Sequence, residues 1–253
     1  MQQKILIHQE IIQLLKLFFG DNNFLSDFVN INETSMSFNI IKFNEVNLLL
    51  TTENPSIDYL QELEVLVEAV LSAFRNNVLP DSKKNIIQVH SGGKQVFKVY
   101  ECLFQNKKIA IKLYKPILTH LIVHTVAITH ILRHIGEYNE LINDKIMSLS
   151  FPNTIALGQP TSMNIVPPIS ILVQDWIGDS EEIHKILPTE HITIIKSLIR
   201  KLTIEEGFML DIMSKNWLVS KNEHKLFYVD LILFNPKDKI LEKIKSWLKD
   251  LEV

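Results

Sequence analysis

Residues 208–234, FMLDIMSKNWLVSKNEHKLFYVDLILF, are the stretch that decides the fold. Asp211 and Asn216 lie five residues apart in it, and the two apolar runs that follow predict a hairpin whose second strand ends at Asp230. Asp230 stands in an otherwise apolar run, where burying an unpaired charge costs several kcal/mol. A bound cation would offset that cost. The stretch therefore predicts one carboxylate that orients an attacking hydroxyl and an Asn–Asp pair of oxygen ligands for magnesium.

A lysine on an earlier strand-like segment adds to this set. Lys112 ends the alternating run IAIK, which follows the turn at Gly92 and Gly93 and a further strand-like run at 96–102. Backbone amides of a glycine turn approach phosphate oxygens closely, and a lysine on the next strand reaches the same phosphates. Alternatively, the glycines form an ordinary turn and Lys112 is a solvated strand-edge lysine, which is the more frequent outcome for such a segment by itself.

Together these motifs resemble those of protein kinases, over residues 86–236 and in the same order. IAIK is similar to the lysine motif of the third kinase strand, DIMSKN to the D-x-x-x-x-N catalytic loop, and FYVDL to the metal-binding aspartate motif. The motif sequences are most similar to those of the divergent bacterial branch that includes lipopolysaccharide-core sugar kinases. Truncated bacterial effector kinases are a similar class. The resemblance implies an α+β, bilobal protein-kinase-like fold with a minimal helical lobe, preceded by a small α+β accessory domain.

The resemblance also implies ATP and magnesium as cofactors and a role for each matching residue. Lys112 would hold the α- and β-phosphates, and Asp211 would be the catalytic carboxylate. The run ILVQDWIG, residues 171–178, is similar to the fifth strand and the hinge whose backbone meets adenine. The implied residues are Asp211, Lys112 and Lys215 for catalysis, Gly92, Gly93, Lys112, Glu140, Gln174, Asp175 and Trp176 for the nucleotide, and Asn216 and Asp230 for the metal.

An ion pair of such folds requires a glutamate on the helix after Lys112. The candidates are Glu137 and Glu140, and both lie farther along the chain than is typical, which implies an inserted helix over 117–135. We favour Glu140, because the sequence at 137–153 resembles the segment that leads from this helix into the fourth strand in this family.

The sequence also departs from the kinase pattern. Met209 and Leu210 take the places of the usual histidine and arginine, so no activation-loop phosphate acts through that arginine. Constitutive activity or none is implied. Asp230 is followed by Leu231, and the usual glycine is absent. Lys215 stands where protein tyrosine kinases often carry an arginine, a position suited to stabilising the transferred phosphate.

A polar run opened by a proline, residues 80–85, is the best domain boundary in the sequence. The predicted domains are a small α+β accessory domain at 1–80, a kinase-like N-lobe with its hinge at 86–178, and a truncated helical C-lobe at 179–253. Only 23 residues follow Asp230, which predicts a minimal helical lobe.

Hydrophobic periodicity predicts the secondary structure of each domain. Apolar residues at helical spacing indicate helices, and alternating runs bounded by turn residues indicate strands. Helices are expected at 4–19, 57–77, 189–207 and from Lys239, with a helical region reaching about Ser150, and strands within 36–51, 86–91, 95–104, 107–115, 154–158, 169–176, 217–220 and 226–234.

Composition limits the function classes. Lys and Arg number 26 against 29 Asp and Glu, so a formal charge of −3 provides no general attraction to nucleic acid or anionic membranes. The single cysteine, Cys102, excludes an internal disulfide and suits a reducing compartment. The apolar stretch at 116–136 contains several histidines and an arginine, too polar for a membrane span. We expect a soluble cytoplasmic protein, or an intracellular one in a host if it is a bacterial effector.

Two histidine pairs at helical i, i+4 spacing, His120 with His124 and His130 with His134, match metal-ligand spacing. No nearby carboxylate or cysteine completes such a site in the sequence. We therefore favour polar interruptions on a partly exposed helix.

Several functions remain compatible with these residues. The first is a phosphotransferase whose hydroxyl acceptor belongs to a protein or to a small molecule such as a sugar. The second is a pseudokinase or protein-interaction module without turnover. Residues 1–80 would then serve as a docking surface for a protein partner, although a regulatory cap or a dimerisation unit fits them equally. The third is an unrelated α+β protein whose motif matches are accidental.

Overall fold

The computed structural model describes two compact α+β units. We call residues 33–118 and 153–176 the sheet unit, and residues 1–32, 119–152 and 177–253 the helical unit. The described residues are 40–52, 55–80, 86–90, 96–115, 124, 127–128, 131–132, 134–142, 147–160, 167–211, 213–220 and 222–234.

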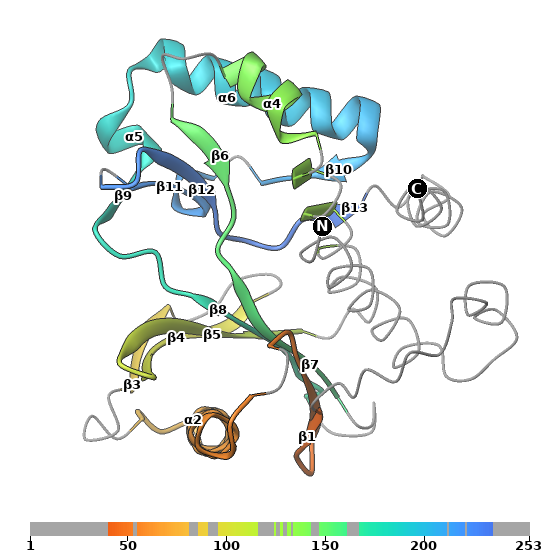
Figure 1. The fold of residues 1–253 in the computed structure, drawn as a ribbon, viewed down its shortest axis with the longest axis vertical. Coiled ribbons are helices and arrows are strands. Elements are labelled where there is room, and N and C mark those ends of the chain that lie inside the picture. Colours follow the sequence, from red (N-terminus) through yellow and green to blue (C-terminus); the bar gives the residue numbers. More distant parts are fainter. Residues whose placement is uncertain are drawn as a thin grey trace, which may run out of the picture. The chain divides into compact units, whose positions relative to one another are not determined.

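The sheet unit contains one seven-stranded sheet in which every neighbouring pair of strands is antiparallel (Figure 1). The strand order is β1-β2-β7-β8-β5-β4-β3. The strands predicted from the sequence in this unit are confirmed. Their bounds are β1 (Ile40–Lys42), β2 (Val46–Leu50), β3 (Ile86–His90), β4 (Val96–Phe104), β5 (Lys107–Tyr114), β7 (Thr154–Pro160) and β8 (Ser170–Asp175).

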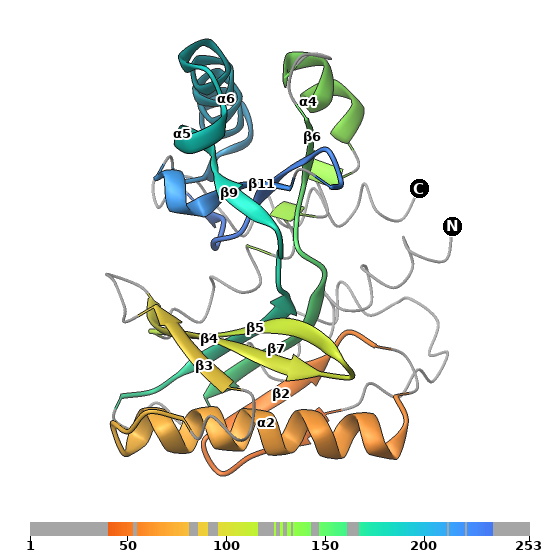
Figure 2. The ribbon, with the colours of Figure 1, turned by 90° about the vertical axis from the view of Figure 1, so that its left-hand side faces the viewer.

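Helix α2 (Ile57–Arg75) runs along one face of this sheet (Figure 2). It begins after Ser56, whose hydroxyl accepts a hydrogen bond from the Tyr59 N–H at 3.1 Å and caps the first turn. Its apolar stripe packs on the sheet face that carries Ile109 and Ile111. The predicted helix is thereby confirmed, and the buried members of the stripe are Leu63, Leu66, Val67, Val70, Leu71 and Ala73.

The boundary predicted at 80–85 does not separate two domains among the described residues. Strand β2 pairs with β7 along its whole length, from Val46 opposite Pro160 to Leu50 opposite Ala156. The two strands expected in an accessory domain are therefore part of the central sheet, and the expected helix, α2, packs against that sheet. Such pairing joins segments more than a hundred residues apart, which local sequence patterns do not reveal.

Gly158 in β7 is required by close packing. A Cβ atom there would lie 2.9 Å from Ile171 Cβ, 2.9 Å from Val46 Cγ1 and 3.1 Å from Leu48 Cδ1. Gly158→Ala is expected to lower the free energy of unfolding by about 1–3 kcal/mol, because the core must shift to admit the methyl group. Gly178→Ala is the matched control, since its Cβ would meet nothing within 4 Å. Chemical denaturation measures both variants, and equal stability would contradict the prediction.

The described part of the helical unit contains two smaller sheets, three α-helices with assigned bounds, and further helical residues at 124, 127–128 and 131–132. One sheet has the order β6-β12-β11-β9, and β10 pairs with β13 in the other. The elements are α4 (Ile135–Ile142), β6 (Ser148–Ser150), β9 (Ser180–Glu182), α5 (Ile183–Ile186), α6 (Thr189–Lys201), a π-helix (Leu202–Glu206), β10 (Phe208–Met209), a 3-10 helix (Ser214–Asn216), β11 (Trp217–Ser220), β12 (Lys225–Tyr228) and β13 (Leu233–Phe234).

Two predictions for this unit are corrected. The helical region does not reach Ser150, because β6 pairs in parallel with β12 and the buried Leu149 donates its N–H to Asn139 Oδ1 at 2.9 Å. The predicted N-lobe also ends differently, since this pairing places 119–152 in the helical unit. The helix predicted at 189–207 is present as α6 and the π-helix, and Gly207 ends it with φ 77°.

The helices predicted at 4–19 and from Lys239 lie outside the described residues. Among the helices that the structure describes, none has both the length and the apolar character needed to cross a membrane.

Candidate functional site

The loop that begins at Asp211 is closed by its own hydrogen bonds. The exposed Asp211 accepts the Met213 N–H on Oδ1 at 3.0 Å, and its carbonyl oxygen accepts the indole N–H of Trp217 at 2.9 Å. The N–H of Asn216 then donates to the Met213 carbonyl at 2.9 Å. These contacts fix the start and the end of the Asp211 loop, residues 211–216, while Asp211 keeps a solvent-facing carboxylate.

The Asp230 turn, residues 229–232, lies against this loop. Val229 donates its N–H to the Asn216 carbonyl at 2.9 Å, and Asp230 Oδ1 accepts the Leu231 N–H at 2.8 Å. Asp230 is half-buried. The structure thus places Asp211 and Asn216 on one loop and Asp230 on a connected turn, two residues beyond the end of the second hairpin strand, β12.

Tyr228 is a second connection between the two loops, and the sequence reasoning missed it. Its hydroxyl accepts the Asp211 N–H at 3.1 Å and donates to the Leu231 carbonyl at 3.2 Å. Burial raises the pKa of Tyr228, and the nearby carboxylates of Asp230 and Asp211 add to the rise. The signal in the sequence was a tyrosine two positions before the aspartate, in a run read only for its apolar character.

Asn216 carries an unpaired polar atom in this site. The residue is 6% exposed, and its Nδ2 has no hydrogen-bond partner among the described residues. Leaving a buried amide unpaired costs about 1–3 kcal/mol. A half-turn of the amide exchanges its oxygen and nitrogen with little change of shape, so either a donor or an acceptor is available to a ligand there.

The side chains of Asn216 and Asp230 carry oxygen atoms, the ligand type that magnesium prefers. Among the residues that the structure describes, no group of three or more His, Cys, Asp or Glu side chains surrounds a metal position. Magnesium is commonly held by one or two carboxylates together with water and substrate phosphates, so a fuller protein cage is not required. Asp230 and the Asn216 amide oxygen supply ligands of that kind.

Lys112 lies in the sheet unit, on the sheet face opposite α2. It is directly opposite Leu172 on β8, so Ser170 and Gln174, two positions to either side, share its face. All three polar residues are buried, with exposures of 8% for Lys112, 3% for Ser170 and 4% for Gln174. Ser170 Oγ has no hydrogen-bond partner among the described residues. The face away from α2 therefore carries these buried polar groups, next to the apolar side chains of Ala110, Tyr114 and Leu172.

The predicted hinge is more constrained than expected. Asp175 donates its N–H to the Asn153 carbonyl at 2.9 Å, and Trp176 donates its N–H to the Lys108 carbonyl at 3.1 Å. Neither N–H group is then available to adenine. A base near Gln174 would meet carbonyl groups of this segment or the N–H groups that follow Trp176. Burial raises the pKa of Asp175, and Lys107 partly opposes that rise.

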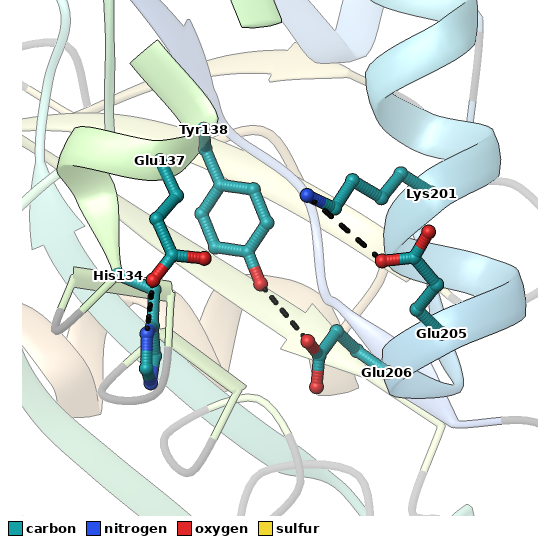
Figure 3. A network of polar contacts seen from close by, with 6 residues as sticks. All are labelled: His134, Glu137, Tyr138, Lys201, Glu205 and Glu206. Atoms are coloured by element: carbon teal, nitrogen blue, oxygen red, sulfur yellow. Dashed lines mark hydrogen bonds and ion pairs between the residues drawn. The ribbon is translucent and has the colours of Figure 1, made fainter. Parts of the chain in front are cut away.

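The two candidate glutamates on α4 differ in their surroundings. Glu137 Oε1 lies 3.0 Å from His134 Nδ1, as Figure 3 shows. In the same view, the Tyr138 hydroxyl donates to Glu206 Oε1 at 3.3 Å and joins α4 to the π-helix. Both glutamates are exposed, and Glu137 already has a partner in His134. The pairing of Glu140 with Lys112 stays a prediction.

Other predicted site residues are placed in part. Lys215 is exposed on the 3-10 helix, and its role at the transferred phosphate stays a prediction. Gly92 and Gly93, predicted to cover the nucleotide, lie outside the described residues.

His124 and Cys102 are both buried inside the units to which they belong. His124 is buried, and its Nδ1 accepts the Ile232 N–H at 3.1 Å, so that nitrogen is already occupied. His120 and His130, the first members of the two predicted pairs, lie outside the described residues. Cys102 is buried in β4, and burial raises its pKa to about 12, which keeps the thiol neutral.

Comparisons with known proteins assign no family. No protein-family profile matches the chain, and no curated protein matches it. Among solved structures, the chain is similar to the crystal structure of the BubR1 kinase domain, with a TM-score of 0.31 and 11% sequence identity. The match covers 88% of this chain, and the chain spans 58% of that kinase-domain chain. So low a TM-score does not establish a shared fold, and the kinase-like fold stays a prediction from the motifs.

Proposed function

We propose that this chain is an ATP- and magnesium-dependent phosphotransferase of kinase-like fold that transfers the γ-phosphate to a hydroxyl acceptor. The observation that carries the proposal is the pair of connected loops bearing Asp211, Asn216 and Asp230. The buried, unpaired amide of Asn216 supports a ligand at this position. The buried polar groups that share the sheet face of Lys112 support a second group of phosphate-binding residues.

In the proposed reaction, Asp211 orients the acceptor hydroxyl and takes its proton. The Met213 N–H holds Oδ1 of Asp211, which leaves Oδ2 to meet the acceptor. The acceptor oxygen forms a bond to the γ-phosphorus while the bond from that phosphorus to the β–γ bridging oxygen breaks, and ADP leaves. The proton passes from Asp211 to solvent. The work of the protein is positioning and electrostatic stabilisation.

The remaining residues handle charge. Asn216 and Asp230 would hold magnesium, which supplies neutralisation of the phosphate charge when it is bound. Lys112 would contact the phosphates, and the exposed Lys215 would meet the transferred group. Each role follows from the donor type and the placement of the side chain on its own element.

The direct test is ATP binding to the wild-type protein with and without magnesium, by calorimetry and thermal shift. ATP binding is expected to require magnesium. With magnesium present, ATP at about 100 times its Kd should add about 2.7 kcal/mol to the free energy of unfolding. Lys112→Ala is expected to weaken MgATP affinity by about 10–100-fold, the value of a hydrogen bond to a charged group.

Lys108→Ala is the matched control for Lys112→Ala. Lys108 is on the same strand but is exposed, and it forms a surface ion pair with Glu101 at 2.6 Å. Such a pair contributes little, so this variant should bind MgATP as the wild type does. Absence of MgATP binding in the wild type would refute the phosphotransferase proposal.

A second candidate is a pseudokinase or interaction module that binds a protein without transferring phosphate. Two methionines near Asp211 favour it, because Met209 is 40% exposed and Met213 is 53% exposed. Flexible thioether side chains adapt to partner surfaces. In that case biological activity would require no phosphate transfer, and Asp211→Asn, which keeps the size of the side chain, would leave it intact.

A further inference from the structure

The Tyr228 hydroxyl is placed where two functional loops meet. It accepts the Asp211 N–H at 3.1 Å and donates its only proton to the Leu231 carbonyl at 3.2 Å. Tyr228 is 1% exposed and Leu231 is 4% exposed, so water does not readily replace either bond. One buried oxygen thus joins the first residue of the Asp211 loop to the residue after Asp230.

The ring and the hydroxyl of Tyr228 have separable roles. The ring packs against Trp217, with centroids 4.9 Å apart, inside the apolar core of the helical unit. Phenylalanine would fill the same space. It would leave the Asp211 N–H and the Leu231 carbonyl without the partner they share in the wild type. The loss would therefore fall on the loops and not on the core.

A second bond determines which end of the Asp211 loop depends on Tyr228. The far end is held separately, because Val229 donates to the Asn216 carbonyl at 2.9 Å. Without the hydroxyl, Asn216 keeps its hydrogen bond from Val229 in the Asp230 turn. The Asp211 N–H loses its hydrogen bond to Tyr228. Asp211 keeps the bond from the Trp217 indole to its carbonyl but loses its link to the Asp230 turn, so the expected consequence is a displacement of Asp211 relative to that turn.

We infer that the Tyr228 hydroxyl is a positioning group that holds Asp211 in place relative to the Asp230 turn. Its effect on phosphate transfer rests on the proposed function, whereas its effect on loop geometry does not. Tyr228→Phe should lower ATP turnover about tenfold while MgATP affinity is retained, because Asp230 keeps its bond from the Leu231 N–H and Asn216 keeps its bond from Val229. A residue needed only for folding would not separate turnover from affinity in this way.

A reporter that is independent of nucleotide is built into the loop. The Trp217 indole N–H donates to the Asp211 carbonyl at 2.9 Å, so its NMR signal reports the position of Asp211. The chain has three tryptophans, and the Trp217 signal is assigned by its loss in Trp217→Phe. In Tyr228→Phe this signal should shift and its hydrogen exchange should accelerate about tenfold. The Trp176 signal, from the sheet unit, should stay unchanged.

Tyr100→Phe is the matched control, because Tyr100 is 1% exposed in the sheet unit. It should leave the Trp217 signal in place. An unchanged Trp217 indole in Tyr228→Phe overturns the inference. If the wild type fails to bind MgATP while the Trp217 signal moves as expected, the proposed function falls and the positioning role stands.

A measurement on the wild type covers the case in which Tyr228→Phe does not fold. The backbone amide of Asp211 should exchange at least about tenfold more slowly than an unstructured peptide, because the Tyr228 oxygen accepts its proton. Exchange at the unstructured rate would overturn the inference without any variant.

Discussion

Asp211→Asn is expected to reduce ATP turnover by about 10²–10⁴-fold, the usual contribution of a general base, while MgATP affinity is unchanged. The asparagine oxygen can still accept the Met213 N–H that Asp211 Oδ1 accepts at 3.0 Å, so the loop should keep its form. What disappears is the ability to take a proton from the acceptor. Turnover is measured as ADP release, with water serving as acceptor until the natural one is identified.

Asp179→Asn is the matched control for this loss. Asp179 is also exposed in the helical unit, and its positive φ of 45° is one that asparagine tolerates. The control should turn over ATP at the wild-type rate. If Asp211→Asn releases ADP at the wild-type rate, the catalytic role of Asp211 is excluded and the interaction-module candidate gains.

Asp230→Asn is expected to weaken MgATP binding by at least about 100-fold, to the level measured without magnesium. Outer-sphere partners of a metal already contribute about 10–100-fold, and a direct anionic ligand should contribute no less. The asparagine oxygen can still accept the Leu231 N–H, which Asp230 Oδ1 accepts at 2.8 Å, so the turn is retained. Calorimetric titration with ATP, with magnesium present or chelated, provides the measurement.

Glu223→Gln removes a carboxylate from the same hairpin and is the control for Asp230→Asn. Glu223 is exposed and pairs with Lys225 at 2.9 Å, a surface contact of small energetic value. Magnesium should enhance ATP binding equally in this variant and in the wild type. An undiminished magnesium effect in Asp230→Asn would show that the metal is bound elsewhere.

The elements predicted best are those whose patterns are local. The stripe of α2 follows from one short segment, because a helix buries one face at its own period. Strand β5 follows from a short, largely apolar run that is buried on both faces from Ile109 to Tyr114. The strand β6 was missed because three residues, Ser148–Ser150, carry too little periodicity to distinguish them from the end of a helix. Its identity depends on the parallel partner β12.

The candidate site was predictable to a similar extent. Asp211, Asn216 and Asp230 became candidates because their chemistry is unusual for an apolar hairpin, and their roles stay predictions. Tyr228 was not found, since a tyrosine in a buried strand is ordinary until its hydroxyl partners are known. The donated N–H groups of Asp175 and Trp176 also escaped notice, because backbone bonds leave no mark in side-chain patterns.

By itself, the sequence determined the positions of most helices and strands and singled out candidate residues whose chemistry suits phosphate or magnesium, because residue type and spacing along one segment are sufficient for both. Only the tertiary structure decided that β2 completes the sheet with β7, that Lys112 and the buried polar groups beside it lie on the sheet face opposite α2, and that Tyr228 joins the Asp211 loop to the Asp230 turn. These features depend on strand register and on buried hydrogen bonds between distant segments, where the energies of many weak contacts act together.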